Sequence, residues 1–304
     1  MLTTNKALLA KADKGKYAVG AFNVNNLEFI KAVIKAAELE QSPVIVQTTE
    51  GAVKYAGIEY LVALAKTAAK LTKIPMSLHL DHGRDLKVIK AAIDAGYTSV
   101  MIDASHVPFE ENIKMTKQVV AWAHKKGVSV EAELGTIGGS EDLVSAKQII
   151  LTDVATAVKF VKATKCDALA VAIGTSHGAY KFSGASKLDL KRLDELKKAL
   201  KMPLVLHGAS GIPKNIVDMA KQYGAQLGDP HGVSDEDVKA AVKLGINKVN
   251  IDSDLRLAFD AGLRKELAME PKEFDPRKIL QPAADLITEV VRAKMQLLGS
   301  SGKA

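Results

Sequence analysis

The chain of 304 residues is 47% hydrophobic and 25% charged, and its 42 Lys and Arg against 35 Asp and Glu leave a formal charge of +7. This composition excludes collagen-like, disordered and disulfide-rich proteins, and the single cysteine, Cys166, indicates a reducing, cytoplasmic location without signal peptide or membrane span. The basic residues alternate with acidic ones at helical spacing, which indicates solvated helix faces rather than a nucleic-acid or membrane surface.

Short apolar, β-branched runs alternate with amphipathic helical segments along almost the whole chain. The runs occupy residues 17–22, 43–48, 75–80, 97–102, 128–133, 167–173, 203–208 and 246–251. Eight strand–helix units of this kind predict an α/β fold, a (β/α)8 TIM barrel. No Gly-x-Gly-x-x-Gly motif follows the first strand, which disfavours a dinucleotide-binding fold. We expect one domain over 1–304, with a C-terminal helical extension from about residue 271.

Polar side chains follow every predicted strand. They lie at residues 23–26, 48–50, 79–83, 103–106, 131–133, 174–178, 207–210 and 250–253. The carboxyl ends of barrel strands, and the loops after them, carry the catalytic groups of such folds. The sequence therefore predicts an active site at this mouth of the barrel.

Three histidines, His82, His177 and His207, follow the third, sixth and seventh strands. A lone histidine at a strand end is more often structural, but three on one rim match a catalytic zinc site with an open fourth position. Asp81 adjoins the first of them, as a carboxylate that either orients a ligand or acts as a general acid or base. His79 lies deeper in its strand and is expected to be structural.

Two small-residue turns, at 177–181 and 207–211, follow proposed ligands and could hold an anion through exposed backbone N–H groups. Lys181 and the Ser210 hydroxyl would add to such a phosphate site. Glycine-rich turns are common, so this signal is weak when taken alone. The segment after Glu133, LGTIGGSEDLVSAKQ, is long and carries Glu141, as expected of a loop that closes over substrate.

Nine motifs occur in order along the chain: VGAFNVNN, SLHLDHG, GYTSVMIDASH, VEAELG, AIGTSHGAYK, PLVLHGASGIP, INKVNIDSDLR, FDPRK and LLGS. Together they closely resemble the class II, metal-dependent fructose-bisphosphate aldolases, in particular the branch shared with tagatose-bisphosphate aldolases. The resemblance implies a lyase of glycolysis and gluconeogenesis that reversibly cleaves fructose 1,6-bisphosphate to dihydroxyacetone phosphate and glyceraldehyde 3-phosphate.

The resemblance also assigns roles to individual positions. His82, His177 and His207 would bind the catalytic Zn²⁺, and Asp103 and Glu133 an alternate or second divalent metal. Asp81 would exchange a proton with the C4 hydroxyl, and Glu141 would handle the proton at the dihydroxyacetone-phosphate carbon. The substrate-binding positions would be Asn23, Thr49, Gly178, Lys181, Gly208, Ala209, Ser210, Asn250, Ile251, Asp252, Ser253 and Arg256.

The resemblance further implies a homo-oligomer, a dimer or tetramer, in which Arg256 reaches the second phosphate of a neighbouring subunit's substrate. Many members also require a monovalent cation, Na⁺ or K⁺. Thr49 departs from the family, since close relatives often carry Ser there. Asp252 favours fructose over tagatose bisphosphate, because tagatose-type members tend to carry Ala at this position.

Other readings compete with a zinc aldolase. Lys248, in the eighth strand, is a candidate Schiff-base lysine, although an interior lysine paired with a carboxylate is the simpler interpretation. A zinc-dependent barrel hydrolase would use the same ligand set, and a non-catalytic sugar-phosphate binder would use the same turns.

Overall fold

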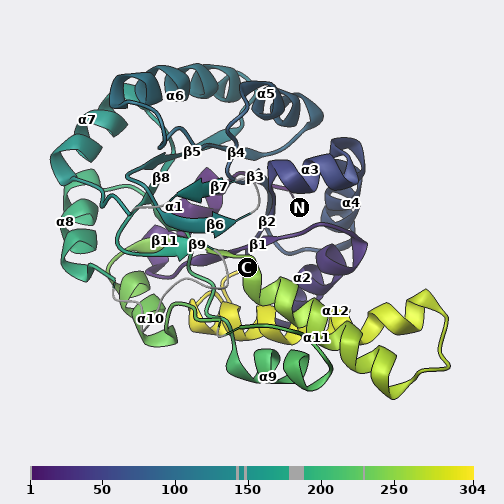
Figure 1. The fold of residues 1–304 in the computed structure, drawn as a ribbon. Helices are drawn as coiled ribbons and strands as arrows, with labels where there is room; N and C mark the ends of the chain where they lie inside the picture. The colour runs from purple at the N-terminus through teal and green to yellow at the C-terminus, as the bar shows by residue number, and fades with distance from the viewer. Residues whose placement is uncertain (1, 142–143, 147–148, 178–187, 229) are drawn as a thin grey trace.

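The computed structural model of this protein describes residues 2–141, 144–146, 149–177, 188–228 and 230–304. Eight parallel strands close into a barrel in the order β1-β11-β10-β8-β5-β4-β3-β2, surrounded by helices (Figure 1). The predicted TIM barrel is therefore confirmed, and each predicted strand overlaps one barrel strand. No helix in the described part of the chain is long and apolar enough to cross a bilayer.

The elements have the following bounds. The barrel strands are β1 (Val19–Asn23), β2 (Val44–Thr48), β3 (Met76–Leu80), β4 (Ser99–Ile102), β5 (Ser129–Leu134), β8 (Ala168–Val171), β10 (Leu204–Leu206) and β11 (Ile246–Ile251). The helices are α1 (Asn5–Gly15), α2 (Leu27–Glu40), α3 (Glu50–Ala56), α4 (Ile58–Leu71), α5 (Leu86–Ala95), α6 (Phe109–His124), α7 (Val154–Thr164), α8 (Leu190–Leu200), α9 (Lys214–Gln222), α10 (Asp235–Lys243), α11 (Ser253–Met269) and α12 (Pro276–Leu297).

Helix α1 closes the amino-terminal end of the barrel. From the sequence, no helix or strand was predicted in this segment. The helix contacts β1, β3, β5 and β11. Its Leu8, Leu9 and Ala12 belong to one apolar cluster with inward-facing strand residues such as Ile45 and Met101. The barrel interior next to α1 therefore holds an apolar cluster, beside a buried hydrogen bond from Ser77 Oγ to Asn5 Oδ1.

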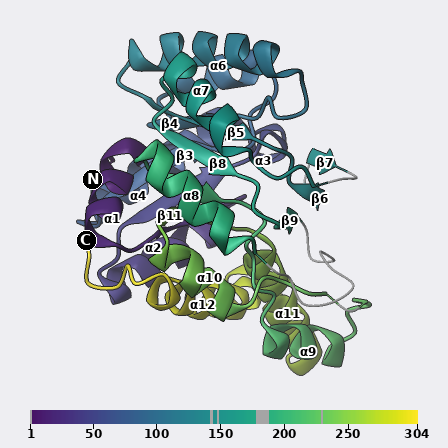
Figure 2. The same cartoon turned by 90° about the vertical axis from the view of Figure 1, so that its left-hand side faces the viewer.

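The expected long loop after β5 contains regular structure. Strand β6 (Gly138–Glu141) pairs antiparallel with β7 (Val144–Ala146) and parallel with β9 (Ser176–His177). Figure 2 shows this small sheet at one end of the barrel, while α1 and both chain termini lie at the other end. The small sheet thus stands beside the mouth at which the predicted site residues lie.

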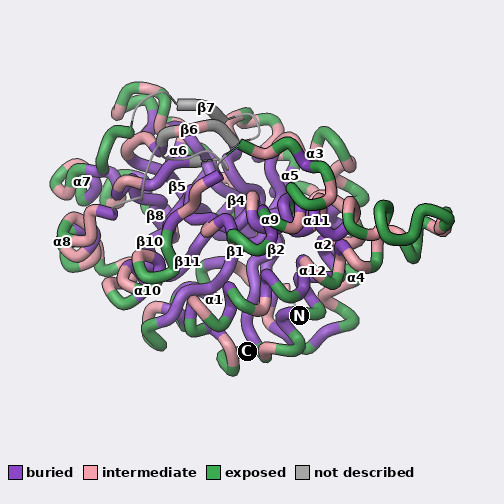
Figure 3. The backbone as a smooth tube through the Cα atoms, turned by 60° about the horizontal axis from the view of Figure 1, so that its bottom comes forward, coloured by how far each residue is buried: buried purple, intermediate pink, exposed green. Residues whose placement is uncertain are grey.

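The C-terminal extension is confirmed as helix α12. It packs against α2 and α11, so the extension covers the outer wall of the barrel. The far end of the α11–α12 pair projects from the barrel (Figure 1) and is exposed, as Figure 3 shows. Phe274, in the turn between the two helices, is 88% exposed.

Candidate active site

Two of the predicted histidines meet at the barrel mouth. His82 follows β3 and His207 follows β10, yet His82 Nε2 and His207 Nδ1 lie 2.9 Å apart. Their rings are edge-to-face, with centroids 4.6 Å apart. Asp81 joins them, since one ligand atom from each of the three residues lies within 4.8 Å of the others. All three are buried, so a cation between them would be shielded from bulk water.

The backbone at His82 is strained in a way that serves this arrangement. Its φ is +48°, a left-handed conformation that a non-glycine residue adopts at a cost of about 1–2 kcal/mol. The turn lets the consecutive side chains of Asp81 and His82 both reach the same point. Such outliers concentrate at functional sites because surrounding structure must hold them in place.

The far nitrogen of His207 is held by a carboxylate. Glu131, in β5, accepts a hydrogen bond from His207 Nε2 through Oε1 at 2.7 Å. Its other oxygen, Oε2, pairs with Lys248 Nζ at 2.8 Å. When a histidine donates one ring N–H to a carboxylate, its other ring nitrogen carries the lone pair and can bind a metal. In His207 these are Nε2 and Nδ1, and carboxylates commonly hold metal-binding histidines in this way. The expected interior lysine–carboxylate pair is therefore confirmed.

The Asp81 carboxylate is fixed by three side-chain amides. Asn250 Nδ2 donates to Oδ1 at 2.9 Å, whereas Asn23 Nδ2 and Gln47 Nε2 donate to Oδ2 at 3.2 and 3.1 Å. Burial opposes ionisation, yet the positive charges of His82 and Lys248 hold the pKa of Asp81 below its usual range. Asp81 is therefore an oriented, ionised carboxylate at neutral pH.

Gln47 was missed by the sequence analysis, because a glutamine inside the run VIVQT looks like part of a core strand. The strand register places Asn23 beside Gln47 and Gln47 beside His79. Since side chains two residues apart share a face, strand parity with Thr49 was the available signal.

Asp103 and Glu133, the proposed second metal pair, lie on the other side of His82. Asp103 Oδ2 is 3.6 Å from His82 Nδ1 and accepts from Arg84 Nε at 2.8 Å. Despite its burial, hydrogen bonding and these positive charges keep the pKa of Asp103 well below normal. Burial and the negative charge of Asp103 raise the pKa of Glu133 to about 8. Arg84 was not foreseen, since its role depends on the turn after β3.

The residues available suit a divalent metal. Four buried carboxylates, of Asp81, Asp103, Glu131 and Glu133, surround the two imidazoles. Although burial lowers it, the pKa of His82 is raised to about 10 by Asp81, Asp103 and Glu133. Oxygen Oε2 of Glu133 is buried with no hydrogen-bond partner among the described residues. A bound cation would neutralise the negative charge of these carboxylates. Imidazole together with carboxylate is a set of ligands that zinc binds.

The turn after β10 runs close to β9. Gly208 has φ of +60°, and a Cβ there would lie 2.6 Å from the carbonyl oxygen of Ser176, so only glycine fits without displacement. Asp254, a buried residue that the sequence analysis missed, accepts from the backbone N–H of Gly211 at 3.1 Å and of Ile212 at 2.7 Å. This carboxylate holds the turn in shape.

The remaining predicted substrate positions lie around the same mouth. Ala209, Ser210, Ile251 and Asp252 are buried, whereas Ser253 is half-buried at the start of α11. Ser210 Oγ accepts from the backbone N–H of Asp252 at 3.3 Å, which links the ends of β10 and β11.

Thr49 and Arg256 line a cavity of about 390 Å³ at the rim. Thr49 Oγ1 caps α3 by accepting from Ala52 N at 3.1 Å, which leaves its hydroxyl hydrogen to donate. Arg256 Nε pairs with Asp252 Oδ1 at 2.8 Å, and its side chain is 45% exposed. A basic side chain and a hydroxyl therefore share one opening.

For four predicted site residues, the side chain lies outside the described part of the structure. Glu141 lies in β6 and His177 in β9, but their side chains are outside the described part of the chain. Gly178 and Lys181 fall entirely outside the described residues. The positions of β6 and β9 nevertheless bring the backbone of both strands to the mouth.

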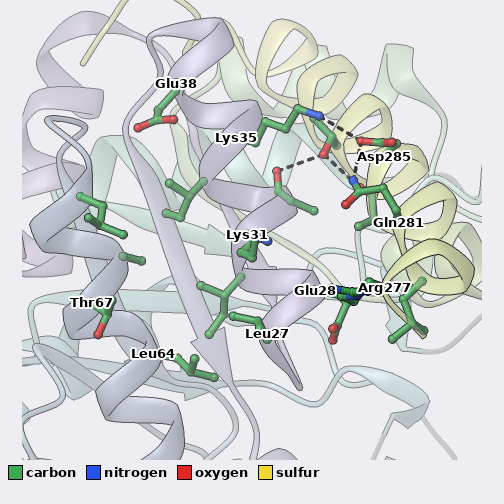
Figure 4. A pocket seen from close by; sticks show the side chains of 18 of the residues that line it. Leu27, Glu28, Lys31, Lys35, Glu38, Leu64, Thr67, Arg277, Gln281 and Asp285 are labelled. Carbon is green, nitrogen blue, oxygen red and sulfur yellow. Dashed lines mark hydrogen bonds and ion pairs between the residues drawn. The ribbon is translucent and has the colours of Figure 1, made fainter. Parts of the chain in front are cut away.

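A second hollow lies far from this chemistry. An apolar groove of about 780 Å³ runs between α2, α4 and α12 on the outer wall (Figure 4). Lys35 and Asp285 form a 2.9 Å ion pair across it. None of the described residues that line it is a histidine or a cysteine, so the buried polar cluster in the barrel, and not this groove, is the candidate active site.

Comparison with known proteins agrees with the geometry. Residues 3–303 match the family described as fructose-bisphosphate aldolase class-II. The chain is 48% identical to the fructose-bisphosphate aldolases of Giardia intestinalis and Thermus caldophilus, over all of this chain and 94% and 100% of those proteins. The crystal structure of the YdjI aldolase from Escherichia coli K12 superposes with a TM-score of 0.81 at 33% identity, covering both chains fully. The chain belongs to the class II fructose-bisphosphate aldolases, a family of lyases.

Proposed function

We propose that this protein reversibly cleaves fructose 1,6-bisphosphate to dihydroxyacetone phosphate and glyceraldehyde 3-phosphate with a bound zinc ion. The observation that carries the proposal is the meeting of His82 and His207 beside Asp81, with Glu131 behind His207. The similarity over the whole chain to the fructose-bisphosphate aldolases of Giardia intestinalis and Thermus caldophilus supports the same activity. His177 would complete the ligand set, and Asp103 and Glu133 would hold an alternate or second divalent ion.

Zinc, when bound, supplies a Lewis acid for the negative charge that carbon–carbon cleavage leaves on the ketone half of the sugar. Asp81 accepts the proton of the C4 hydroxyl, a role that its ionised state and its three amide donors suit. Glu141 returns a proton to the ketone carbon after the aldehyde has left. In condensation, each carboxyl group reverses its own step: Glu141 removes the proton from the ketone carbon, and Asp81 returns a proton to the C4 oxygen.

The phosphate and hydroxyl groups of the substrate would be held at the rim. Gly208, Ala209, Ser210, Ser253 and the loop residues Gly178 and Lys181 would bind the ketose and its first phosphate. Asn23, Asn250 and Ile251 would line the floor, with Thr49 at the side. A monovalent cation, Na⁺ or K⁺, would assist this phosphate site.

Arg256 is proposed to reach the second phosphate in the active site of a neighbouring copy, within a homodimer or homotetramer. Its half-exposed guanidinium at the rim supports this assignment. Asp252, which holds Arg256, supports a preference for fructose over tagatose bisphosphate. We place this activity in the cytoplasm, within glycolysis and gluconeogenesis, where the buried free thiol of Cys166 would remain reduced.

The test is aldol cleavage measured in a coupled assay before and after chelation. EDTA should abolish activity, and added Zn²⁺ should restore it. Activity that survives EDTA but is lost on borohydride reduction with substrate would refute the zinc mechanism in favour of a Schiff base. An equal or higher kcat/KM for tagatose 1,6-bisphosphate would refute the proposed substrate preference.

A further inference from the structure

Lys248 is a fully buried cation in the middle of the barrel. It lies in β11 with 0% of its side chain exposed. Its Nζ is 2.8 Å from Glu131 Oε2 and 3.4 Å from His79 Nε2. Burying a lysine costs several kcal/mol, and replacing a buried ion pair by apolar side chains is often neutral or stabilising. The pair is therefore poorly explained as a device for stability.

The carboxylate bridges the lysine and a proposed zinc ligand. Glu131 turns Oε2 to Lys248 and Oε1 to His207 Nε2, at 2.8 and 2.7 Å. Because a carboxylate only accepts, the hydrogen of His207 must lie on Nε2, and Nδ1 then faces His82 with its lone pair. Without Lys248 on Oε2, the Glu131 side chain would be free to turn away from His207, and it would no longer dictate this tautomer.

On the other side, Lys248 is held by a second interior chain. His79 Nδ1 lies 2.9 Å from Ser99 Oγ, and that hydroxyl donates to the Ser129 carbonyl at 3.3 Å. The register of β3, β4 and β5 sets these three residues side by side. Lys248 thus has carboxylate and imidazole partners and no exposed surface, an arrangement suited to a fixed charge and not to attack on a carbonyl.

We propose that Lys248 is a positioning residue for the metal: by pairing with Glu131 it holds that carboxylate on His207 and so presents His207 Nδ1 for ligation. The inference rests on the proposed zinc site. It assigns the barrel lysine to metal affinity, at a distance from the ion, rather than to covalent catalysis.

The experiment measures the zinc dissociation constant of purified Lys248→Met by competition with a chromophoric chelator. Loss of such an outer partner typically weakens metal affinity about 10–100-fold, and we expect a loss in this range. The Co²⁺-substituted variant should also show an altered visible spectrum, because the geometry around His207 changes. Unchanged affinity and an unchanged Co²⁺ spectrum would overturn the proposal.

Lys197→Met is the matched control. Lys197 is also a largely buried lysine in an ion pair, 2.6 Å from Asp13 Oδ1, but it contacts α1 at the closed end of the barrel. It should lose thermal stability and keep its zinc affinity. An equal loss of affinity in both variants would show a general effect of destabilisation, and the positioning role would be wrong.

A double-mutant cycle tests whether Lys248 acts through Glu131. Glu131→Gln alone should weaken zinc binding, and the double variant should be no weaker than the worse single variant, because the two residues form one unit. Losses that multiply would overturn the proposal. If Lys248→Met folds poorly, Glu131→Gln alone keeps the proposal testable, because an unchanged zinc affinity in that variant would overturn it. Wild-type protein that binds no zinc would instead refute the proposed function.

Discussion

Replacing Asp81 by Asn removes the charge of the proposed proton acceptor while keeping its shape. In the native site, one carboxylate oxygen accepts from Asn250 and the other from Asn23 and Gln47. An amide has only one accepting oxygen, so its NH₂ group must face at least one of these donors. The better orientation keeps the two bonds from Asn23 and Gln47 and gives up the bond from Asn250.

The magnitudes separate an effect on rate from an effect on folding. One buried donor left without an acceptor costs about 1–3 kcal/mol of stability, and the lower burial cost of a neutral amide offsets part of this. Removing a general acid or base lowers the rate by about 10²–10⁴-fold. Such a loss corresponds to roughly 3–5 kcal/mol in the activation free energy. We therefore expect a large fall in kcat with a small fall in Tm.

The assay is coupled cleavage of fructose 1,6-bisphosphate, with Tm and zinc content measured on the same preparations. Asp167→Asn is the control, since this buried carboxylate accepts from Val130 N and pairs with His124 at the opposite end of the barrel. The control should lose stability and keep its kcat. If Asp81→Asn retained more than a tenth of the wild-type kcat while binding zinc normally, the assignment of Asp81 as the proton acceptor would be wrong.

Three further predictions concern the backbone, the thiol and the metal-free protein. Gly208→Ala should lower kcat/KM and Tm more than Gly127→Ala, because both have positive φ but only the first brings a Cβ within 2.6 Å of Ser176 O; equal losses would contradict this. Burial raises the pKa of Cys166 to about 12, so iodoacetamide should label the native protein far more slowly than the unfolded protein at pH 8. Despite its burial, His82 has a pKa raised by Asp81 and its other acidic neighbours from 6.5 to about 10, so its stabilising contribution is complete below pH 6.5 and declines as the pH rises toward 10. The free energy of unfolding of EDTA-treated protein should therefore fall between pH 7 and 9.5, and a constant or rising value would refute the reasoning.

The barrel and much of its mouth could be predicted from local patterns. Apolar runs of strand length between amphipathic segments give parallel strands, and parallel strands in a closed barrel end at the same rim. For that reason Asp81, His82 and His207 could be predicted to converge although 125 residues separate the two histidines. The segment after Glu133, which the sequence predicted as a loop, instead contains strand β6, and β6 pairs with β9 from another part of the chain. Such pairing has no local signal.

The supporting residues could not be found in this way. Gln47, Arg84 and Asp254 act only through partners that the register and the turns bring near them. Glu131 was recognised as a polar strand end, but its position between Lys248 and His207 depends on three strands at once. Helix α1 was missed because its apolar face becomes meaningful only once it closes the end of a barrel.

Local patterns in the sequence were enough to predict the class of fold, the end of the barrel at which polar residues gather, the family and a set of candidate metal and substrate residues. They were enough because hydrophobic periodicity and strand-end motifs are local properties of the chain. Only the tertiary structure shows which nitrogen of His207 faces His82, which amides hold Asp81 and which carboxylate pairs with the buried Lys248. These depend on contacts between strands far apart in sequence, whose distances of 2.7–3.2 Å are set by the closed barrel and its register.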